Sequence, residues 1–228
     1  MISVIIPTYN EQQNISAIIN YLKELRANQY VSEIIVVDGG SIDNTFKLAQ
    51  EAGARAIKSE KKGRAFQMNC GAYLAEGEVL YFLHADSYPP ENFSSEIIKA
   101  MKAGFKSGCF RMAFDHPHWF LRANAWFTRF NINWIRFGDQ SLFVTKPVFV
   151  AAGGFNPNLI IMEDQEIVGR LQKYGKFKVI PATIITSARK YLKNGVYRLQ
   201  AIFFLLCILY QLGLSQKILT RFYQKLIK

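Results

Sequence analysis

Val79-Leu80-Tyr81-Phe82-Leu83-His84-Ala85-Asp86 is an apolar run that ends in an imidazole and a carboxylate. The continuous apolar part predicts a strand that is buried on both faces. Ser87-Tyr88-Pro89-Pro90 follows, and we expect strand pairing to stop there because proline cannot donate to a sheet. Open α/β sheets bind ligands at the carboxyl ends of their strands, so His84 and Asp86 are predicted to lie in a metal or phosphate site. An aspartate that only begins the next turn is the simpler alternative.

The composition is that of a folded, basic protein. The 228 residues suffice for one sizeable core, in one domain or at most two. The formal net charge of +11 suits an anionic partner such as nucleic acid, nucleotide phosphates or an acidic membrane. Cys70, Cys109 and Cys207 are scattered, which predicts neither a zinc site nor a disulfide framework and fits a reducing compartment.

The sequence predicts a cytoplasmic protein. Met1 leads directly into a strand-like run, without the basic and apolar regions of a cleaved signal peptide. The apolar run from Ala201 to Tyr210 is too short to predict a membrane span.

The first half of the chain alternates between predicted strands and helices. Apolar and β-branched runs predict strands over residues 2–6, 33–37, 54–58 and 78–83. Helices are expected to begin near Asn14, near Asp43 or Asn44, and after Gly63. This order implies an α/β fold with a mostly parallel central sheet and helices on both faces. The strand ends then bring three polar segments to one edge: residues 7–11, 38–41 and 84–86.

Two common nucleotide-binding motifs are absent from this half. The first predicted strand is followed by Pro7-Thr8-Tyr9-Asn10-Glu11, which lacks the glycines of a dinucleotide-binding turn. No GxxxxGK[ST] loop occurs either. We therefore expect neither a dinucleotide cofactor nor a Walker-type phosphate loop.

The second half is predicted to add strands over residues 107–114 and 142–144 and helices over 91–102 and 146–152. His116-Pro117-His118 is interpreted as a loop on apolar surface rather than a metal site, because a proline separates the histidines and aromatic residues adjoin them. The aromatic and basic stretch 119–134 could line a sugar or lipid-phosphate pocket, stack on nucleic acid, or form plain core. Gly138-Asp139-Gln140 precedes a predicted buried strand, and its polar groups would face the cleft.

Glu163 and Asp164 begin a predicted helix whose apolar face includes Ile167, Val168 and Leu171. The helix dipole alone favours acids in a first turn. A carboxylate that acts as a general base is the functional explanation. The pattern by itself leaves both open.

From Val196 onward the chain is predicted to be helical, first apolar and then amphipathic. In the amphipathic part, basic residues recur at helical spacing opposite apolar ones: Lys217, Arg221, Lys225 and Lys228 against Ile218, Leu219, Phe222 and Leu226. A basic amphipathic helix beside an apolar run predicts peripheral contact with an anionic membrane. Packing on the protein body or on a second subunit is the equal alternative.

Several of these segments, taken in order, resemble the family 2 glycosyltransferases of GT-A fold. They are Val4–Glu11, Ile35–Thr45, Leu83–Asp86, Gly153–Phe155 and Glu163–Asp164. Three further segments look like a bacterial subgroup of small, single-domain members: Gly63–Asn69, Gly138–Gln140 and Ser187–Lys190. The resemblance implies a catalytic domain over residues 1–195, with a donor half over 1–105 and an acceptor half over 106–195. Residues 196–228 would form a C-terminal helical tail.

The resemblance also implies roles in donor binding. Four residues at the first two strand ends would bind the nucleobase and ribose: Pro7, Thr8, Glu11 and Asp38. Arg64, in a basic loop, would contact the diphosphate, and Arg189 would close over the same group. Asp86 takes the last position of the family's DxD motif, where it would hold Mn²⁺ or Mg²⁺ together with substrate phosphates. The first acid of that motif is replaced by His84, which suits manganese better than magnesium.

In the acceptor half, the resemblance implies that Asp164 is the catalytic base. It would remove the proton of the acceptor hydroxyl as that oxygen attacks the sugar. Glu163, Asp139 and Gln140 would contact the acceptor or the donor sugar.

The function implied by the resemblance is inverting transfer of a sugar from a nucleoside diphosphate to a hydroxyl acceptor. A UDP-sugar is favoured over a GDP-sugar, and a lipid or lipid-linked acceptor at the inner face of the membrane would suit the basic tail. The family's frequent QxxRW motif is absent, which argues against a processive polysaccharide synthase. Two alternatives remain: a nucleotidyltransferase-like enzyme, and a non-catalytic basic protein associated with membrane or nucleic acid. No nucleic-acid partner is expected under the leading interpretation.

Overall fold

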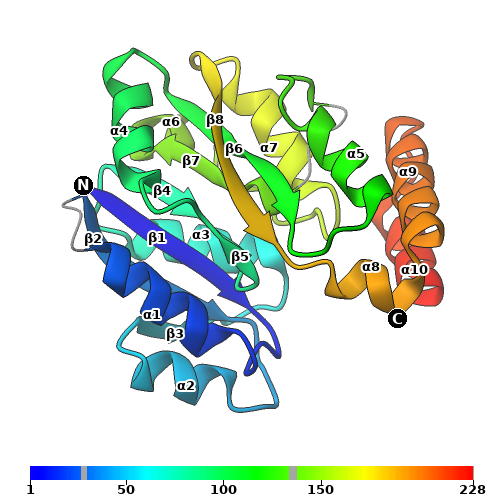
Figure 1. Ribbon diagram of the computed structural model, residues 1–228, viewed down its shortest axis with the longest axis horizontal. Coiled ribbons are helices and arrows are strands. Elements are labelled where there is room, and N and C mark those ends of the chain that lie inside the picture. The colour runs from blue at the N-terminus through cyan, green and yellow to red at the C-terminus, as the bar shows by residue number, and fades with distance from the viewer. Residues whose placement is uncertain (27–29, 134–137, 228) are drawn as a thin grey trace.

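The computed structural model describes residues 1–26, 30–133 and 138–227 (Figure 1). The strands are β1 (Ile2–Thr8), β2 (Val31–Asp38), β3 (Arg55–Lys58), β4 (Val79–Phe82), β5 (Ser87–Tyr88), β6 (Ser107–Phe114), β7 (Leu142–Thr145) and β8 (Phe177–Thr186). The α-helices are α1 (Ile15–Arg26), α2 (Thr45–Glu51), α3 (Arg64–Leu74), α4 (Phe93–Lys102), α5 (Trp119–Phe127), α6 (Lys146–Ala151), α7 (Glu163–Leu171), α8 (Arg189–Asn194), α9 (Val196–Gln211) and α10 (Gln216–Leu226). A short 3-10 helix, η2, spans Gly138–Gln140. Trp134, in the aromatic stretch, and Lys228, in the basic tail, lie outside the described residues.

The described strands form one sheet in the order β3-β2-β1-β4-β7-β6-β8-β5. The first four to appear along the chain pair in parallel, as do β6 and β8. Strand β7 runs antiparallel between β4 and β6, and β5 runs antiparallel to β8. The predicted α/β class with a largely parallel sheet and helices on both faces is confirmed.

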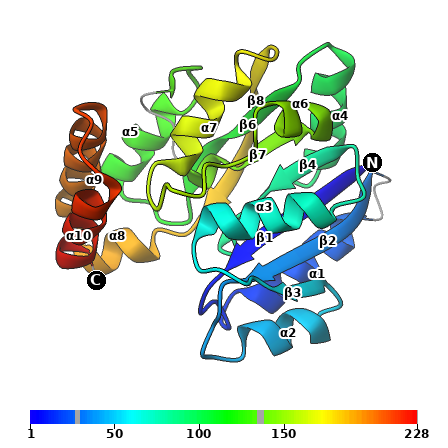
Figure 2. The same cartoon turned by 180° about the vertical axis from the view of Figure 1, so that it is seen from behind.

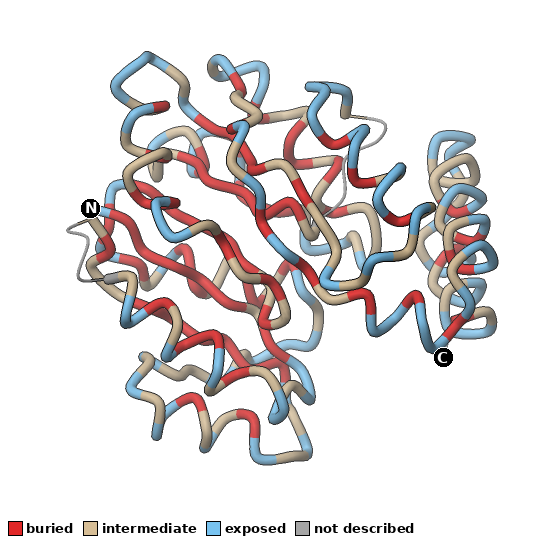
Figure 3. Tube along the Cα trace, in the orientation of Figure 1, coloured by how far each residue is buried: buried red, intermediate tan, exposed pale blue. Residues whose placement is uncertain are grey.

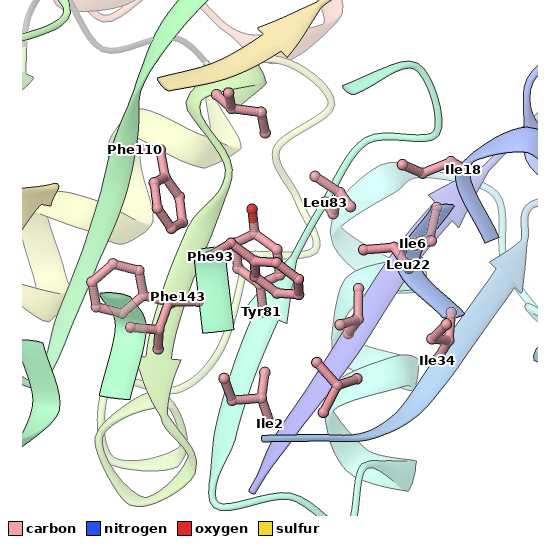
Figure 4. Packing of buried hydrophobic residues seen from close by; sticks show 14 of the residues in the cluster. Ile2, Ile6, Ile18, Leu22, Ile34, Tyr81, Leu83, Phe93, Phe110 and Phe143 are labelled. Atoms are coloured by element: carbon pink, nitrogen blue, oxygen red, sulfur yellow. The ribbon is translucent and has the colours of Figure 1, made fainter. Parts of the chain in front are cut away.

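Each face of the sheet has its own apolar core. Helices α1, α2 and α4 pack on one face, and α3, α6 and α7 pack on the other (Figures 1 and 2). The first core is dense in aromatic and branched side chains around Tyr81 and Phe93, whose rings stack with centroids 5.2 Å apart (Figure 4). The sheet is thus held rigidly from both sides, which fixes the positions of the loops at its edge.

Strand β4 explains why the opening stretch is apolar without alternation. Its side chains go to the two cores in turn: Tyr81 joins one, and Leu80 and Phe82 join the other. All four residues of β4 are buried. A strand in the middle of a helix-covered sheet has no solvent face, so no polar alternation is needed.

Two features of the sheet differ from expectation. Ser87 and Tyr88 do not end strand pairing: they form β5, opposite Thr186 and Ile185 of β8. The prolines follow only at positions 89 and 90, after the paired residues. Strand β8 itself was not predicted, because Pro181 interrupts its pattern; the register with β6 shifts there, between Phe110 and Arg111.

The C-terminal helices share a third apolar cluster with the rest of the chain. Leu121 of α5 and Tyr191 of α8 are buried against Leu199, Leu206 and Leu219 of α9 and α10. Packing of the tail on the protein body, one of the two alternatives, therefore occurs, although much of the outer surface of α9 and α10 stays exposed (Figure 3). Across the ranges that the structure describes, none of the helices combines the length and apolarity that a membrane crossing requires.

Candidate active site

The loop between β4 and β5 carries Asp86 across the sheet to the end of β8. Ser87 lies opposite Thr186, and their hydroxyl oxygens are 2.9 Å apart. Arg189 follows Thr186 by three residues, so its guanidinium Nη2 lies 3.5 Å from a carboxylate oxygen of Asp86. The two-residue strand that the sequence analysis missed is therefore what brings these two residues together.

Arg189 also joins the end of β8 to the end of β1. Its Nη2 lies 2.9 and 3.2 Å from the two carboxylate oxygens of Glu11. Glu11 is held in turn by its backbone N–H, which donates to the hydroxyl of Thr45 at the start of α2. One arginine thus links two acids, Glu11 and Asp86, that were predicted separately for the donor site.

The ends of β1 and β2 form a second fixed part of the site. Thr8 lies opposite Asp38 in the parallel register, and both side chains are buried. Asp38 accepts hydrogen bonds from the backbone N–H groups of Gly40 and Ser41 and from the Ser41 hydroxyl. These bonds fold the Asp38–Ser41 segment into a tight turn around the carboxylate. Pro7, one residue earlier, lies opposite Val37 and is partly buried.

Gln67 of α3 holds these two strand ends together through hydrogen bonds. The sequence analysis gave this residue no individual role. Its side-chain N–H groups donate to the carbonyl oxygens of Thr8 at 2.6 Å and Val37 at 2.8 Å. A Cβ on Gly39 would come within 2.9 Å of the Gln67 amide nitrogen, so any larger residue here would displace this hydrogen-bonded amide. The Gly63–Asn69 motif thus contains a buried side chain that links two strand ends, and we call it the Gln67 clamp. Its membership of this motif was the sequence signal by which Gln67 could have been found.

Asn69, in the same motif, fixes a more distant loop. Its amide donates to the carbonyl of Phe155 at 2.8 Å and accepts from the Phe155 N–H at 2.9 Å. Phe155 is buried in the core next to Phe82. Helix α3 therefore positions both the β1–β2 edge and the Gly153–Phe155 loop.

His84 and Asp139 meet across the site. His84 Nδ1 lies 2.8 Å from a carboxylate oxygen of Asp139, which belongs to η2. Burial lowers the pKa of His84, but the hydrogen bond and the charge of Asp139 outweigh it and leave that pKa raised. Burial raises the pKa of Asp139, but His84 and Arg64 more than offset it and hold the pKa low. The two residues form a charge-assisted pair.

Arg64 opens α3 and faces the start of α7. Its Nη1 lies 3.1 Å from a carboxylate oxygen of Glu163 and 3.6 Å from one of Asp164. The Glu163 side chain is only 3% exposed, whereas that of Asp164 is 21% exposed. A helix dipole favours an acid in the first turn, but it does not require that acid to be buried against an arginine of another helix. The dipole alone therefore does not explain the position of Glu163.

The surroundings of Glu163 at the start of α7 increase its proton affinity. Burial, together with the adjacent charge of Asp164, raises the pKa of Glu163 to about 7, although Arg64 opposes the rise. Burial likewise raises the pKa of Asp86, and the charge of Asp139 adds to the effect, against His84 and Arg189. Raised carboxyl pKa values at the ends of strands and helices are typical of functional sites.

Backbone conformation marks the same segments. Within the described ranges, the residues other than glycine with positive φ are Asn10, Ser141 and Met162, at 55°, 57° and 67°. Each adjoins a predicted site segment: Asn10 precedes Glu11, Ser141 follows Gln140, and Met162 precedes Glu163. Such conformations cost free energy and persist where surrounding contacts enforce them, often at functional sites.

Gln140 is the predicted site residue whose contacts are structural. Its amide is buried and donates to the carbonyl oxygens of Phe110 at 3.1 Å and Thr128 at 3.2 Å. It therefore ties η2 to β6 and to the end of α5. Asp139, one residue before it, is the member of this motif that reaches the site.

The residues fit a divalent cation whose remaining ligands come from substrate. The described part of the chain contains no group of three or more His, Cys, Asp or Glu side chains able to hold a metal alone. Asp86 supplies a carboxylate, and hard cations in such sites commonly take most of their oxygens from phosphates and water. The pairing of His84 Nδ1 with Asp139 has the form of the carboxylate–histidine pairs that orient metal-binding imidazoles.

Comparison with known proteins identifies the family. The model of the family "Glycosyl transferase family 2" matches residues 3–156, more than half of the chain. The chain therefore belongs to glycosyl transferase family 2, as its motifs predicted.

Curated relatives match about half of the chain. A dolichol-phosphate mannosyltransferase of Pyrococcus furiosus is 33% identical over 109 residues, which cover 45% of this chain and 30% of the relative. An undecaprenyl-phosphate 4-deoxy-4-formamido-L-arabinose transferase of Proteus mirabilis is 25% identical over 129 residues, covering 53% of this chain and 40% of the relative. The chain thus spans well under half of the length of these relatives.

Solved structures match nearly the whole fold. The mannosyltransferase PcManGT from Pyrobaculum calidifontis, in complex with GDP-Man and Mn²⁺, superposes with a TM-score of 0.72 at 17% identity, covering 97% of this chain and 69% of that one. S. aureus TarS 1–349 in complex with UDP-GlcNAc gives a TM-score of 0.65 at 16% identity, covering 97% and 70%. At this identity the likeness shows the fold alone, which is the predicted GT-A type.

Proposed function

We propose that this chain is an inverting glycosyltransferase that moves a sugar from a nucleoside diphosphate to a hydroxyl acceptor. The observation that carries the proposal is the pairing of two arginines with four carboxylates around one sheet edge: Arg189 with Glu11 and Asp86, and Arg64 with Glu163 and Asp164. Each of these arginines can release its carboxylate partner and bind the oxygens of a diphosphate instead, since a guanidinium binds either group through two hydrogen bonds.

In this proposal the β1–β2 edge holds the nucleoside. Thr8, whose carbonyl is bonded by Gln67, and Asp38 opposite it would define the depth of the base pocket, and Pro7 and Glu11 would line it. A bound divalent cation would neutralise the charge that builds up on the departing diphosphate, with Asp86 as its carboxylate ligand. His84 and Asp139 would fill the position of the missing first acid as a paired unit.

Asp164 is the proposed base. Its side chain is more exposed than that of Glu163, so an acceptor hydroxyl can reach it. The acceptor oxygen would form a bond to the anomeric carbon while the bond from that carbon to the diphosphate oxygen breaks. The hydroxyl proton would pass to Asp164, and the electron pair of the broken bond would leave with the nucleoside diphosphate. Glu163, with its raised pKa, would orient Arg64 and the acceptor.

Support for the substrate classes comes from the relatives. Solved structures of the same fold are complexes with GDP-Man, UDP or UDP-GlcNAc, and two curated relatives are named for lipid-phosphate substrates. We propose a UDP- or GDP-sugar as donor and the hydroxyl group of a lipid or lipid-linked compound as acceptor. The exposed apolar residues of α9 and α10 would bring the site to an anionic membrane.

Replacing Asp164 by asparagine tests the proposal. With a donor that stabilises the protein in a thermal-shift screen with and without Mn²⁺, Asp164→Asn is expected to lower kcat by about 10²–10⁴-fold while leaving donor Kd within about twofold. Glu24→Gln, an exposed acid of α1, is the control and keeps wild-type turnover. Unchanged turnover in Asp164→Asn would refute the assignment. Release of pyrophosphate in place of a nucleoside diphosphate would identify a nucleotidyltransferase instead.

A further inference from the structure

A groove of about 600 Å³ lies between helix α5 and the strand pair β6–β8. None of the candidate active-site residues lines it. Met112, Phe114 and Ile185 give it an apolar surface, and Trp126 adds an aromatic one. Its volume is in the range of pockets that bind small molecules rather than single ions.

The groove is strongly basic. Arg122 and Arg129 line it from the α5 side, and Arg111 lines it from β6. Arg122 and Trp126 are four residues apart on one face of α5, and Arg129 follows in the turn after the helix. Among the described residues, no carboxylate oxygen lies within 4 Å of these three guanidinium groups. Several other arginines of the chain form salt bridges with carboxylates. Three arginines in one groove without a carboxylate partner are therefore expected to bind an anion.

Two of these arginines have N–H groups available for a ligand. Arg129 is held by a 2.8 Å hydrogen bond from its Nε to the carbonyl of Trp126, and its guanidinium lies 4.3 Å from the centre of the Trp126 ring. This arrangement keeps the remaining N–H groups of Arg129 in a fixed plane. The Nε of Arg111 is buried and has no hydrogen-bond partner in the described part of the chain. A buried unpaired donor is costly and needs an explanation such as a missing ligand.

The other titratable groups of the groove do not cancel this charge. Asp115 lines it, but one of its carboxylate oxygens accepts the N–H of Ala188 at 2.7 Å. His116 lines it as well, and its Nδ1 accepts the N–H of His118 at 3.3 Å. Three arginines against one partly engaged carboxylate leave a net positive groove.

We propose that this groove binds a phosphate or diphosphate group attached to an apolar or aromatic moiety. Planar guanidinium groups match the oxygens of a phosphate through paired hydrogen bonds, and the Trp126 side would hold the attached group. The site is separate from the proposed donor site and does not depend on the transferase reaction. Its ligand is a phosphorylated small molecule or the headgroup of an anionic lipid.

Fluorine NMR of the full chain labelled with 5-fluorotryptophan tests the site with inorganic pyrophosphate in metal-free buffer. Trp119, Trp126 and Trp134 give the signals, and Trp126→Phe assigns the one in the groove. Pyrophosphate is expected to shift the Trp126 signal in a saturable way. In Arg111→Gln/Arg122→Gln the affinity read from this signal should fall about tenfold or more, because two charge-assisted contacts are lost. A Trp126 signal that does not respond at millimolar pyrophosphate overturns the proposal.

Matched controls separate this site from general attraction to a basic protein. Lys102→Gln/Lys173→Gln removes the same charge from exposed positions outside the groove and should keep the wild-type titration. An equal loss of affinity in both double variants would overturn the proposal. Arg64→Gln should leave the Trp126 response unchanged, which distinguishes the groove from the proposed donor site. Arg122→Gln, on the exposed side of α5, repeats the test if the double variant does not fold.

Vesicles distinguish the two sources of the phosphate group. Phosphatidylcholine vesicles containing phosphatidic acid are compared with phosphatidylcholine alone. Loss of binding to the acidic vesicles in Arg111→Gln/Arg122→Gln, with retention in Lys102→Gln/Lys173→Gln, assigns a lipid headgroup. Equal vesicle binding by both variants, together with the pyrophosphate response, assigns a phosphorylated small molecule.

Discussion

Nη2 of Arg189 lies 2.9 Å from Oε1 of Glu11, although 178 residues separate them along the chain. The contact joins the loop after the first strand to the loop after the last. The same guanidinium also approaches Asp86, so it lies where we propose that the donor diphosphate binds.

Replacing Arg189 by glutamine tests this position. The variant leaves Glu11 and Asp86 without their cation, so we expect donor Kd to rise by about tenfold. Isothermal titration with the donor identified by thermal shift measures the change. Lys193→Gln, an exposed residue of the same helix, loses the same charge and should bind the donor normally. Equal affinities for both variants would count against a diphosphate contact at Arg189.

Glu163 predicts a particular dependence of stability on pH. Its pKa is raised from 4.5 to about 7, so the folded state binds this proton more tightly than the unfolded chain. The resulting stabilisation is complete below about pH 4.5 and is lost as the pH rises through 7. Between pH 4.5 and 8, the wild type should lose about 3 kcal/mol more unfolding free energy than Glu163→Gln.

Urea denaturation at several pH values measures this difference. Glu51→Gln, which removes an exposed carboxylate, is expected to follow the wild-type curve. Parallel curves for the wild type and Glu163→Gln would show that Glu163 ionises normally in the folded protein.

The Gln67 clamp links stability to donor binding. Gln67→Met keeps the approximate size of the side chain but removes its two hydrogen bonds to the carbonyl groups of Thr8 and Val37. We expect a loss of about 1–3 kcal/mol in unfolding free energy and weaker donor binding. Gln13→Met, at an exposed position, should change stability by less than about 0.5 kcal/mol. A Gln67 variant with lower stability and unchanged donor affinity would limit the clamp to folding.

The exposed apolar residues of the tail predict membrane contact. Phe204 and Leu212 are 57% and 71% exposed. Phe204→Gln/Leu212→Gln should weaken co-sedimentation with anionic vesicles by about tenfold, because two large side chains no longer enter the interface. Tyr73→Gln/Val150→Gln replaces two other exposed apolar residues, 85% and 67% exposed, and should sediment like the wild type. Wild-type sedimentation of both variants would contradict membrane contact through α9.

Local patterns were sufficient for most of the fold. The apolar run of β4, the helical spacing in α1 and the Gly53 stop after α2 each depend on residues close in sequence, and each was placed to within a few residues. Strands β5 and β8 were not. A two-residue strand has no periodicity, and Pro181 breaks the pattern of β8, so pairing with strands distant in sequence decides both: β5 with β8, and β8 with β6.

The sequence by itself determined the family, the order of the elements and the acidic and basic residues of the candidate site, because motifs record residue types in linear order. Tertiary structure decided which of those residues meet. It paired Arg64 with Glu163, His84 with Asp139, and Arg189 with both Glu11 and Asp86. These contacts depend on strand register and helix packing across more than fifty residues, and no local pattern encodes such distances. The same is true of the Asp86 loop: β5, paired to the last strand, carries it to Arg189.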